Sequence, residues 1–170
     1  MKPEKLIQVE QAKYFAIGCH GEQKRKYTNE PYWAHCQGVV ELLSQYYPYP
    51  EAYVVGWLHD VVEDTWATCF DIEEHFNKTI AQYVSDLTMP SIEAGNRAYR
   101  MKHYNETLAN ACELVQTVKY ADLIHNSASI EKFDPDFAHV YLKEKKELLA
   151  VVNKGEPRLY KMACTQCGFL

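Results

Sequence analysis

The spacing of apolar residues most strongly limits what this chain can fold into. Apolar side chains recur at the period of an amphipathic α-helix along nearly the whole sequence, and no stretch resembles a parallel or antiparallel sheet. Seven glycines and seven prolines are too few for an all-β protein built from many tight turns. We therefore expect an all-α fold, with residues 1–170 forming a single domain.

The same pattern predicts a series of helices separated by polar or proline-containing breaks. The predicted helices cover 4–18, 33–47, 51–64, 71–77 and 79–87, then a region from about 94 to 130 with at most one break, and C-terminal helices within 136–167. Between the first two helices, the polar segment 21–31 holds a compact basic cluster, Lys24, Arg25 and Lys26. The helix over 51–64 is apolar on nearly every face, so it is expected to be buried, with His59 and Asp60 at its centre.

Composition and charge exclude several classes of protein. Eighteen basic against 23 acidic residues give a net charge of −5, which argues against a nucleic-acid partner. The apolar runs are far shorter than the ~20 residues needed to cross a bilayer, and the first residues lack the apolar stretch of a signal peptide. We expect a cytoplasmic protein without a membrane partner, and the oligomeric state stays open. Cys164 and Cys167 form a CxxC without the second pair of ligands that a zinc site needs, so we interpret them as structural.

Polar residues occupy the apolar stripes of three separate helices. They are His35, the adjacent pair His59 and Asp60, and Asp122, which is followed one turn later by His125 and Asn126. A buried carboxylate without a partner is costly, so these groups are expected to be paired, neutralised or bound to a metal. Two imidazoles and two carboxylates are a common ligand set for a divalent cation.

Each of these residues also has a purely structural interpretation when taken alone. His35 would be a hydrogen-bonded core histidine, and Asp122 would pair with Lys119 on its own helix. His59 and Asp60 would form a polar pair bonded to the neighbouring backbone. The combination on three helices favours the metal site.

Three motifs stand in the same order as in one known family. They are the segment 19–35, which ends in EPYWAH, the run LHDVVEDT at 58–65, and KYADLIHN at 119–126. Together they resemble the HD-domain phosphohydrolases, in particular the ppGpp-hydrolysing branch of RelA/SpoT-type proteins and their small stand-alone relatives. The resemblance covers about residues 15–130 and implies an HD-type helical bundle. It also implies a divalent cation, most often Mn²⁺, held by His35, His59, Asp60 and Asp122.

The resemblance further implies roles for five residues beside the metal. Glu63 and Asp64 fall on the acidic pair that acts on the attacking water. Arg25 and Lys26 fall on the basic loop pair that meets the nucleotide, and Asn126 falls on a substrate or water contact. Without the resemblance, the acidic pair would be read as carboxylates near a helix end and the basic pair as a solvated loop cluster.

The expected activity is metal-dependent removal of the 3′-pyrophosphate from guanosine 3′,5′-bis(diphosphate), either ppGpp or pppGpp. Two positions depart from the family pattern. Leu123 stands where the family often has a basic residue, and Cys36 stands where a proline commonly follows the first histidine. These departures leave open a related hydrolase of another phosphorylated nucleotide, either a dNTP triphosphohydrolase or an NADPH 2′-phosphatase. A non-catalytic nucleotide-binding regulator is the alternative from a different functional class.

Overall fold

The computed structural model describes residues 3–169, apart from the side chain of Glu131. Within this range the chain forms α-helices, one short 3₁₀ helix (η1) and no β-strand, which confirms the predicted all-α class. The elements are α1 (Pro3–His20), α2 (Trp33–Tyr46), α3 (Pro50–Leu58), α4 (Val61–Asp64), α5 (Cys69–His75), α6 (Lys78–Leu87), η1 (Ile92–Ala94), α7 (Arg97–Asn110), α8 (Glu113–Phe133), α9 (Pro135–Val151) and α10 (Pro157–Gln166).

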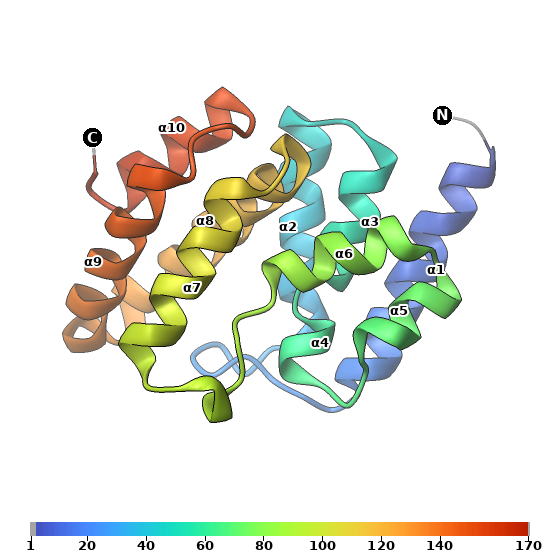
Figure 1. The fold of residues 1–170 in the computed structure, drawn as a ribbon, viewed down its shortest axis with the longest axis horizontal. Coiled ribbons are helices and arrows are strands. Elements are labelled where there is room, and N and C mark those ends of the chain that lie inside the picture. Colours follow the sequence, from blue (N-terminus) through green and yellow to red (C-terminus); the bar gives the residue numbers. More distant parts are fainter. Residues whose placement is uncertain (1–2, 170) are drawn as a thin grey trace.

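Helix α2 lies in the middle of the molecule between two groups of helices, and it packs against both α3 and α8 (Figure 1). Figure 1 shows α1, α3, α5 and α6 on one side of α2, and α7 to α10 on the other side. Helix α3 packs against both α1 and α2, and α8 packs against α2, α9 and α10. The α2–α8 contact brings segments that are far apart in the sequence together in the centre of the bundle.

Helix α3 is buried because its sequence is apolar around most of its circumference. Val54, Val55 and Leu58 are each at most 2% exposed, as the apolar run predicts. Gly56 allows the close approach to α2, since a Cβ at this position would lie 2.9 Å from Cδ1 of Leu43. This contact fixes the end of α3 relative to α2.

The predicted helix over 51–64 is wrong in one respect: it is interrupted at His59 and Asp60. Helix α3 ends at Leu58, and the short α4 begins at Val61. The ring Nδ1 of His59 bonds to the backbone oxygen of Gly56 at 2.8 Å. In an uninterrupted helix, that oxygen would accept from the N–H of residue 60. The two residues therefore lie in a turn between helices and not at the centre of one.

The other predicted breaks are confirmed. The region from about 94 to 130 is divided once, between α7 and α8, at Ala111 and Cys112. The C-terminal region forms α9 and α10, which begin at 135 and end at 166, against predicted limits of 136 and 167. Cys164 and Cys167 are buried in the hydrophobic core, which fits a structural role.

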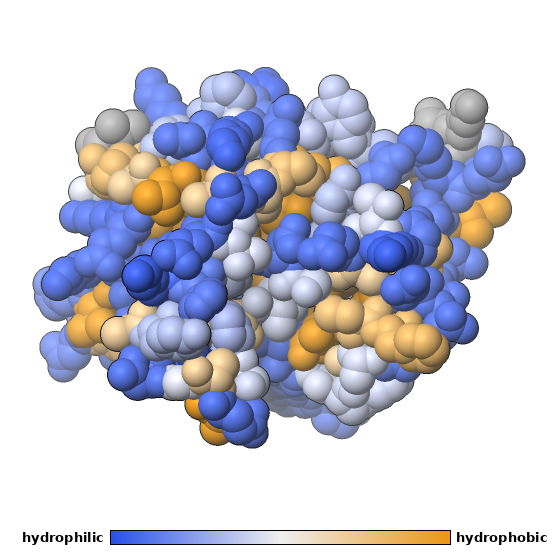
Figure 2. Space-filling model, viewed as in Figure 1, coloured by the Kyte–Doolittle hydropathy of each residue, from blue (hydrophilic) through white to orange (hydrophobic). Residues whose placement is uncertain are grey.

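The surface is mostly hydrophilic with separate hydrophobic patches. One patch in Figure 2 lies over the region of α4 and α5, and the segment between these helices contains the exposed Trp66. Among the described residues, no helix combines the length and the apolar character needed to span a membrane.

Candidate metal centre

Four predicted ligands converge inside the bundle from three parts of the chain. One donor atom from each of His35, His59, Asp60 and Asp122 lies within 4.8 Å of every other. His35 comes from the first turn of α2, His59 and Asp60 from the turn after α3, and Asp122 from the middle of α8. His35, His59 and Asp122 are each at most 3% exposed. The helix packing thus builds one compact polar cluster in an apolar interior.

The donor atoms of the cluster face one another at short range. Nε2 of His35 lies 3.1 Å from Nε2 of His59 and 3.2 Å from Oδ1 of Asp122. Nε2 of His59 lies 3.1 Å from Oδ2 of Asp60. Lone pairs that face each other at these distances repel unless a proton or a metal cation lies between them, and two imidazoles with two carboxylates are a donor set that fits a divalent ion.

Neighbouring groups orient His59 and Asp60 from behind. The Nδ1 of His59 meets the carbonyl of Gly56, so this nitrogen carries the hydrogen and Nε2 presents its lone pair to the cluster. The hydroxyl of Tyr32 donates to Oδ2 of Asp60 at 2.7 Å. Fixed tautomers and carboxylate orientations are what a preorganised metal site requires.

Two side chains of α8 hold Asp122, and the predicted pairing of Asp122 with Lys119 is confirmed. Nζ of Lys119 lies 2.7 Å from Oδ2 of Asp122, as expected for a pair on one helix. The amide of Asn126 donates to Oδ1 at 2.6 Å. Oδ1 is also the oxygen that faces His35, so the lysine pair and the metal interpretation are compatible.

The charges in the cluster shift the pKa values in opposite directions. Burial opposes charge on both aspartates, but the imidazoles hold the pKa of Asp60 well below its usual range, and chiefly Lys119 does the same for Asp122. Burial would likewise lower the pKa of His59, yet Asp60 and Asp122 raise it to about 10. Without a metal, a proton on His59 therefore balances part of the carboxylate charge.

The predicted acidic pair lies at the edge of the cluster, on α4. The carboxylate of Glu63 accepts from the backbone N–H of Met89 at 2.9 Å. Partial desolvation, together with the nearby charge of Asp60, raises the pKa of both Glu63 and Asp64. Both side chains nevertheless remain accessible to solvent, which a residue acting on a bound substrate needs.

The predicted basic pair divides between two places. The loop before α2 is closed by a backbone hydrogen bond from Arg25 to Glu30, and Nη1 of Arg25 donates to Oδ1 of Asn126 at 2.8 Å. Lys26 instead points to the α8–α9 junction, where its Nζ lies 3.4 Å from a carboxylate oxygen of Asp134. The structure thus joins Arg25 to the cluster through Asn126 and places Lys26 apart from it.

A cavity of about 530 Å³ lies beside Arg25 and behind the cluster. Residues of α2 and α8 line it, including Gly38, His125 and Ser129. Its size falls in the range of small-molecule sites. His125 also contacts the cluster directly, since its Nδ1 lies 2.9 Å from Nδ1 of His35.

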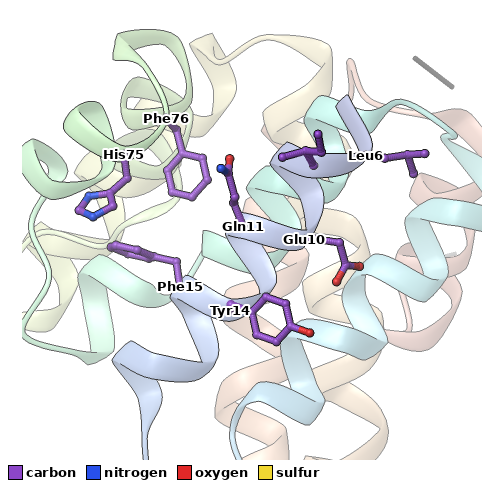
Figure 3. A pocket seen from close by; sticks show the side chains of 8 residues that line it. Leu6, Glu10, Gln11, Tyr14, Phe15, His75 and Phe76 are labelled. Atoms are coloured by element: carbon purple, nitrogen blue, oxygen red, sulfur yellow. The ribbon is translucent and has the colours of Figure 1, made fainter. Parts of the chain in front are cut away.

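Another hollow, of about 570 Å³, lies between α1 and the end of α5 and has a different character. Figure 3 shows its aromatic side chains, and the ring of Phe15 packs against His75 and Phe76 there. None of the predicted site residues lines this apolar groove.

Three supporting residues are not among the predicted site residues: Tyr32, His125 and Gly38. Tyr32 and His125 lie within motifs that carry the family resemblance, and His125 continues the stripe that contains Asp122. The stripe therefore indicates His125 as an inward-facing polar residue, although it does not indicate its contact with His35. The contact between Gly38 and His125 joins two distant helices, and no local pattern indicates it.

Both the sequence and the fold match known proteins. The family model of the HD domain matches residues 12–108. A Synechocystis protein named probable guanosine-3′,5′-bis(diphosphate) 3′-pyrophosphohydrolase is 32% identical over 142 residues, which are 80% of this chain and 18% of that protein. The chain thus spans about a fifth of that relative's length.

A shorter relative and a solved structure match more of their own length. The Xenopus tropicalis protein named guanosine-3′,5′-bis(diphosphate) 3′-pyrophosphohydrolase MESH1 is 30% identical over 133 residues, covering 74% of this chain and 71% of that protein. A structure of a metazoan ortholog of SpoT, described as hydrolysing ppGpp, superposes with a TM-score of 0.83 at 22% identity and covers 96% of this chain and 97% of its own. On the strength of the family match and these relatives, the chain belongs to the HD domain family.

Proposed function

We propose that this protein is a metal-dependent hydrolase that removes the 3′-pyrophosphate from guanosine 3′,5′-bis(diphosphate). The observation that carries the proposal is the convergence of His35, His59, Asp60 and Asp122 within 4.8 Å. The names of the Synechocystis and Xenopus relatives support this substrate. The cytoplasmic location remains a prediction.

We propose His35, His59, Asp60 and Asp122 as the ligands of one divalent cation, with Mn²⁺ as the expected ion. When bound, such an ion polarises a phosphoryl oxygen and lowers the pKa of water. Two neutral imidazoles and two carboxylates together balance its charge. The supporting contacts from Gly56, Tyr32 and Lys119 keep His59, Asp60 and Asp122 in place.

The phosphate groups would be bound at the edge of the cluster next to the basic loop. Arg25 is held there by Asn126, and the guanidinium also reaches the hydroxyl of Ser129 at 3.4 Å. Its planar set of five donors leaves further N–H groups for phosphate oxygens. The adjacent cavity of about 530 Å³ offers room for the nucleoside.

Glu63 and Asp64 would carry out the proton transfers. Hydrolysis forms a bond from a water oxygen to phosphorus and breaks the bond from phosphorus to the 3′ oxygen. One proton must leave the water and one must reach the 3′ oxygen. A carboxylate whose pKa is raised is suited to exchange protons near neutral pH, and general acid–base catalysis typically contributes ~10²–10⁴-fold.

The departure at Leu123 does not favour another substrate. Leu123 is 1% exposed and belongs to the hydrophobic core. Its side chain therefore packs in the core and offers no polar group to a nucleotide.

A product assay with several nucleotides tests the proposal. We expect purified protein with Mn²⁺ to release pyrophosphate from ppGpp, and His59→Ala and Asp60→Ala to abolish the release. Release of triphosphate from a dNTP, or of phosphate from NADPH, would identify a different substrate. Tight ppGpp binding without turnover would indicate a regulator.

A further inference from the structure

The two histidines proposed as ligands are supported by different acceptors. A ligating histidine usually donates its second ring N–H to a fixed acceptor, which sets its tautomer and orientation. For His59 that acceptor is the carbonyl of Gly56. For His35 it is another imidazole, since Nδ1 of His125 lies 2.9 Å from Nδ1 of His35 and the ring centroids are 4.9 Å apart.

The position of the hydrogen in this contact follows from valence. A neutral imidazole has one N–H and one lone pair. If Nε2 of His35 presents its lone pair to the cluster, Nδ1 carries the hydrogen and must donate it. Nδ1 of His125 is then the acceptor, and the hydrogen of a neutral His125 lies on its Nε2.

The helix opposite His125 contains a glycine where the ring lies. Gly38 is on α2, one turn after His35. A Cβ at residue 38 would lie 2.2 Å from Nε2 and 2.3 Å from Cδ2 of His125. Glycine is unfavourable in the interior of a helix, so its presence here has a packing reason: it leaves the space that the ring of His125 occupies.

We infer that His125 is a positioning residue that holds His35 in its metal-binding tautomer, and that Gly38 provides the space for it. The inference rests on the proposed function because it takes His35 as a metal ligand. Without an acceptor at His125, the hydrogen of His35 can move to Nε2, which then cannot bind a cation. Loss of such a supporting acceptor typically weakens metal binding by ~10–100-fold.

Two substitutions at His125 separate hydrogen bonding from packing. In His125→Asn, an amide oxygen can take the place of the acceptor Nδ1, whereas His125→Leu fills space without an acceptor. We expect His125→Leu to raise the Kd for Mn²⁺, measured by isothermal titration calorimetry, by ~10–100-fold. We expect His125→Asn to stay much closer to the unaltered protein. Unchanged affinity in His125→Leu, or an equal loss in both variants, would overturn the inference.

Gly38→Ala tests the second half of the inference, with Gly18→Ala as its matched control. Both glycines lie within helices, but a Cβ at Gly18 meets nothing within 4 Å. We expect Gly38→Ala to weaken Mn²⁺ binding and Gly18→Ala to leave it unchanged. The clash in Gly38→Ala also destabilises the fold. The double variant Gly38→Ala/His125→Ala, which lacks the ring, is therefore measured beside it.

Removing the ring relieves the clash, so the double variant should regain the thermal stability that Gly38→Ala loses without regaining its affinity. A double variant that is as unstable as Gly38→Ala would show that residue 38 meets some other group, which overturns the role of Gly38. Full affinity in the double variant would overturn the role of His125.

These measurements distinguish a failure of this inference from a failure of the proposed function. Mn²⁺ affinity is measured without nucleotide. If the variants behave as expected but ppGpp is not hydrolysed, the proposed activity fails and the positioning role stands. If ppGpp is hydrolysed and His125→Leu binds Mn²⁺ normally, only the positioning role fails. No Mn²⁺ binding by the unaltered protein would overturn this inference.

Discussion

Arg25 and Asn126 are 101 positions apart in the chain, yet Nη1 of Arg25 donates a 2.8 Å hydrogen bond to the side-chain oxygen of Asn126. The amide nitrogen of Asn126 donates in turn to Asp122. One amide therefore connects the basic loop to a proposed metal ligand. Such a connection holds the guanidinium in place before a substrate arrives, which reduces the entropic cost of binding.

Arg25→Ala should weaken substrate binding more than it slows turnover. A hydrogen bond to a charged group contributes about 1.5–3 kcal/mol, which corresponds to roughly a 10–100-fold rise in KM for ppGpp. Lys24→Ala is the control, since Lys24 is an exposed residue of the same loop. Lys26→Ala should have a smaller effect than Arg25→Ala because Lys26 pairs with Asp134. A larger rise for Lys26→Ala would contradict this order.

Glu63→Gln and Asp64→Asn should each reduce kcat without reducing Mn²⁺ affinity. Neither side chain belongs to the four-ligand cluster, and loss of a general acid or base typically costs ~10²–10⁴-fold. Steady-state kinetics and calorimetry with Mn²⁺ test the two parts separately. Glu73→Gln, at an exposed position of α5, should behave like the unaltered protein. If either substitution abolished metal binding, that residue would be a ligand.

Mn²⁺ should stabilise the fold, and a chelator should reverse the effect. A ligand at 100 times its Kd stabilises the native state by about 2.7 kcal/mol, which for a domain of this size raises Tm by roughly 5–10 °C. His35→Ala should lose this shift, whereas His139→Ala, at an exposed position of α9, should keep it. An undiminished shift in His35→Ala would place the binding site elsewhere in the molecule.

Lys145 should make stability depend on pH in the alkaline range. This residue of α9 is 8% exposed, and burial together with the charge of Lys119 lowers the pKa of its amine from 10.5 to about 8. Between pH 8 and 10.5, the unfolded chain therefore binds more protons at this residue than the native state does. The free energy of unfolding therefore rises as the pH increases from 8 to 10.5. This gain in stability is lost again as the pH falls towards 8.

Lys145→Met should remove that dependence and stabilise the protein at pH 7 by about 1–3 kcal/mol, because a buried charge is replaced by an apolar side chain. Thermal or urea unfolding at several pH values measures both effects. Lys143→Met is the matched control on the exposed face of the same helix. An equal response in the two variants would show that burial of Lys145 is not the cause.

The all-α class, the breaks between most helices and the identity of the four converging residues could be predicted from the sequence. Helical periodicity and proline or polar breaks are local signals, so each is readable from neighbouring residues. The three motifs together named His35, His59, Asp60 and Asp122. The interruption at His59 could not be predicted, because it depends on a side-chain bond to Gly56 that competes with the helix backbone.

The tertiary structure alone decided how the residues of the site are paired. It placed Arg25 beside Asn126 and Lys26 beside Asp134, although the two basic residues are adjacent in the chain. It also set the ring of His125 against Gly38, between His35 and the cavity. These contacts join segments separated by about 90–110 positions, and they exist only because α2 and α8 pack together with the loop before α2. A linear pattern specifies which side chains face inward, whereas the packing of helices specifies which of them meet.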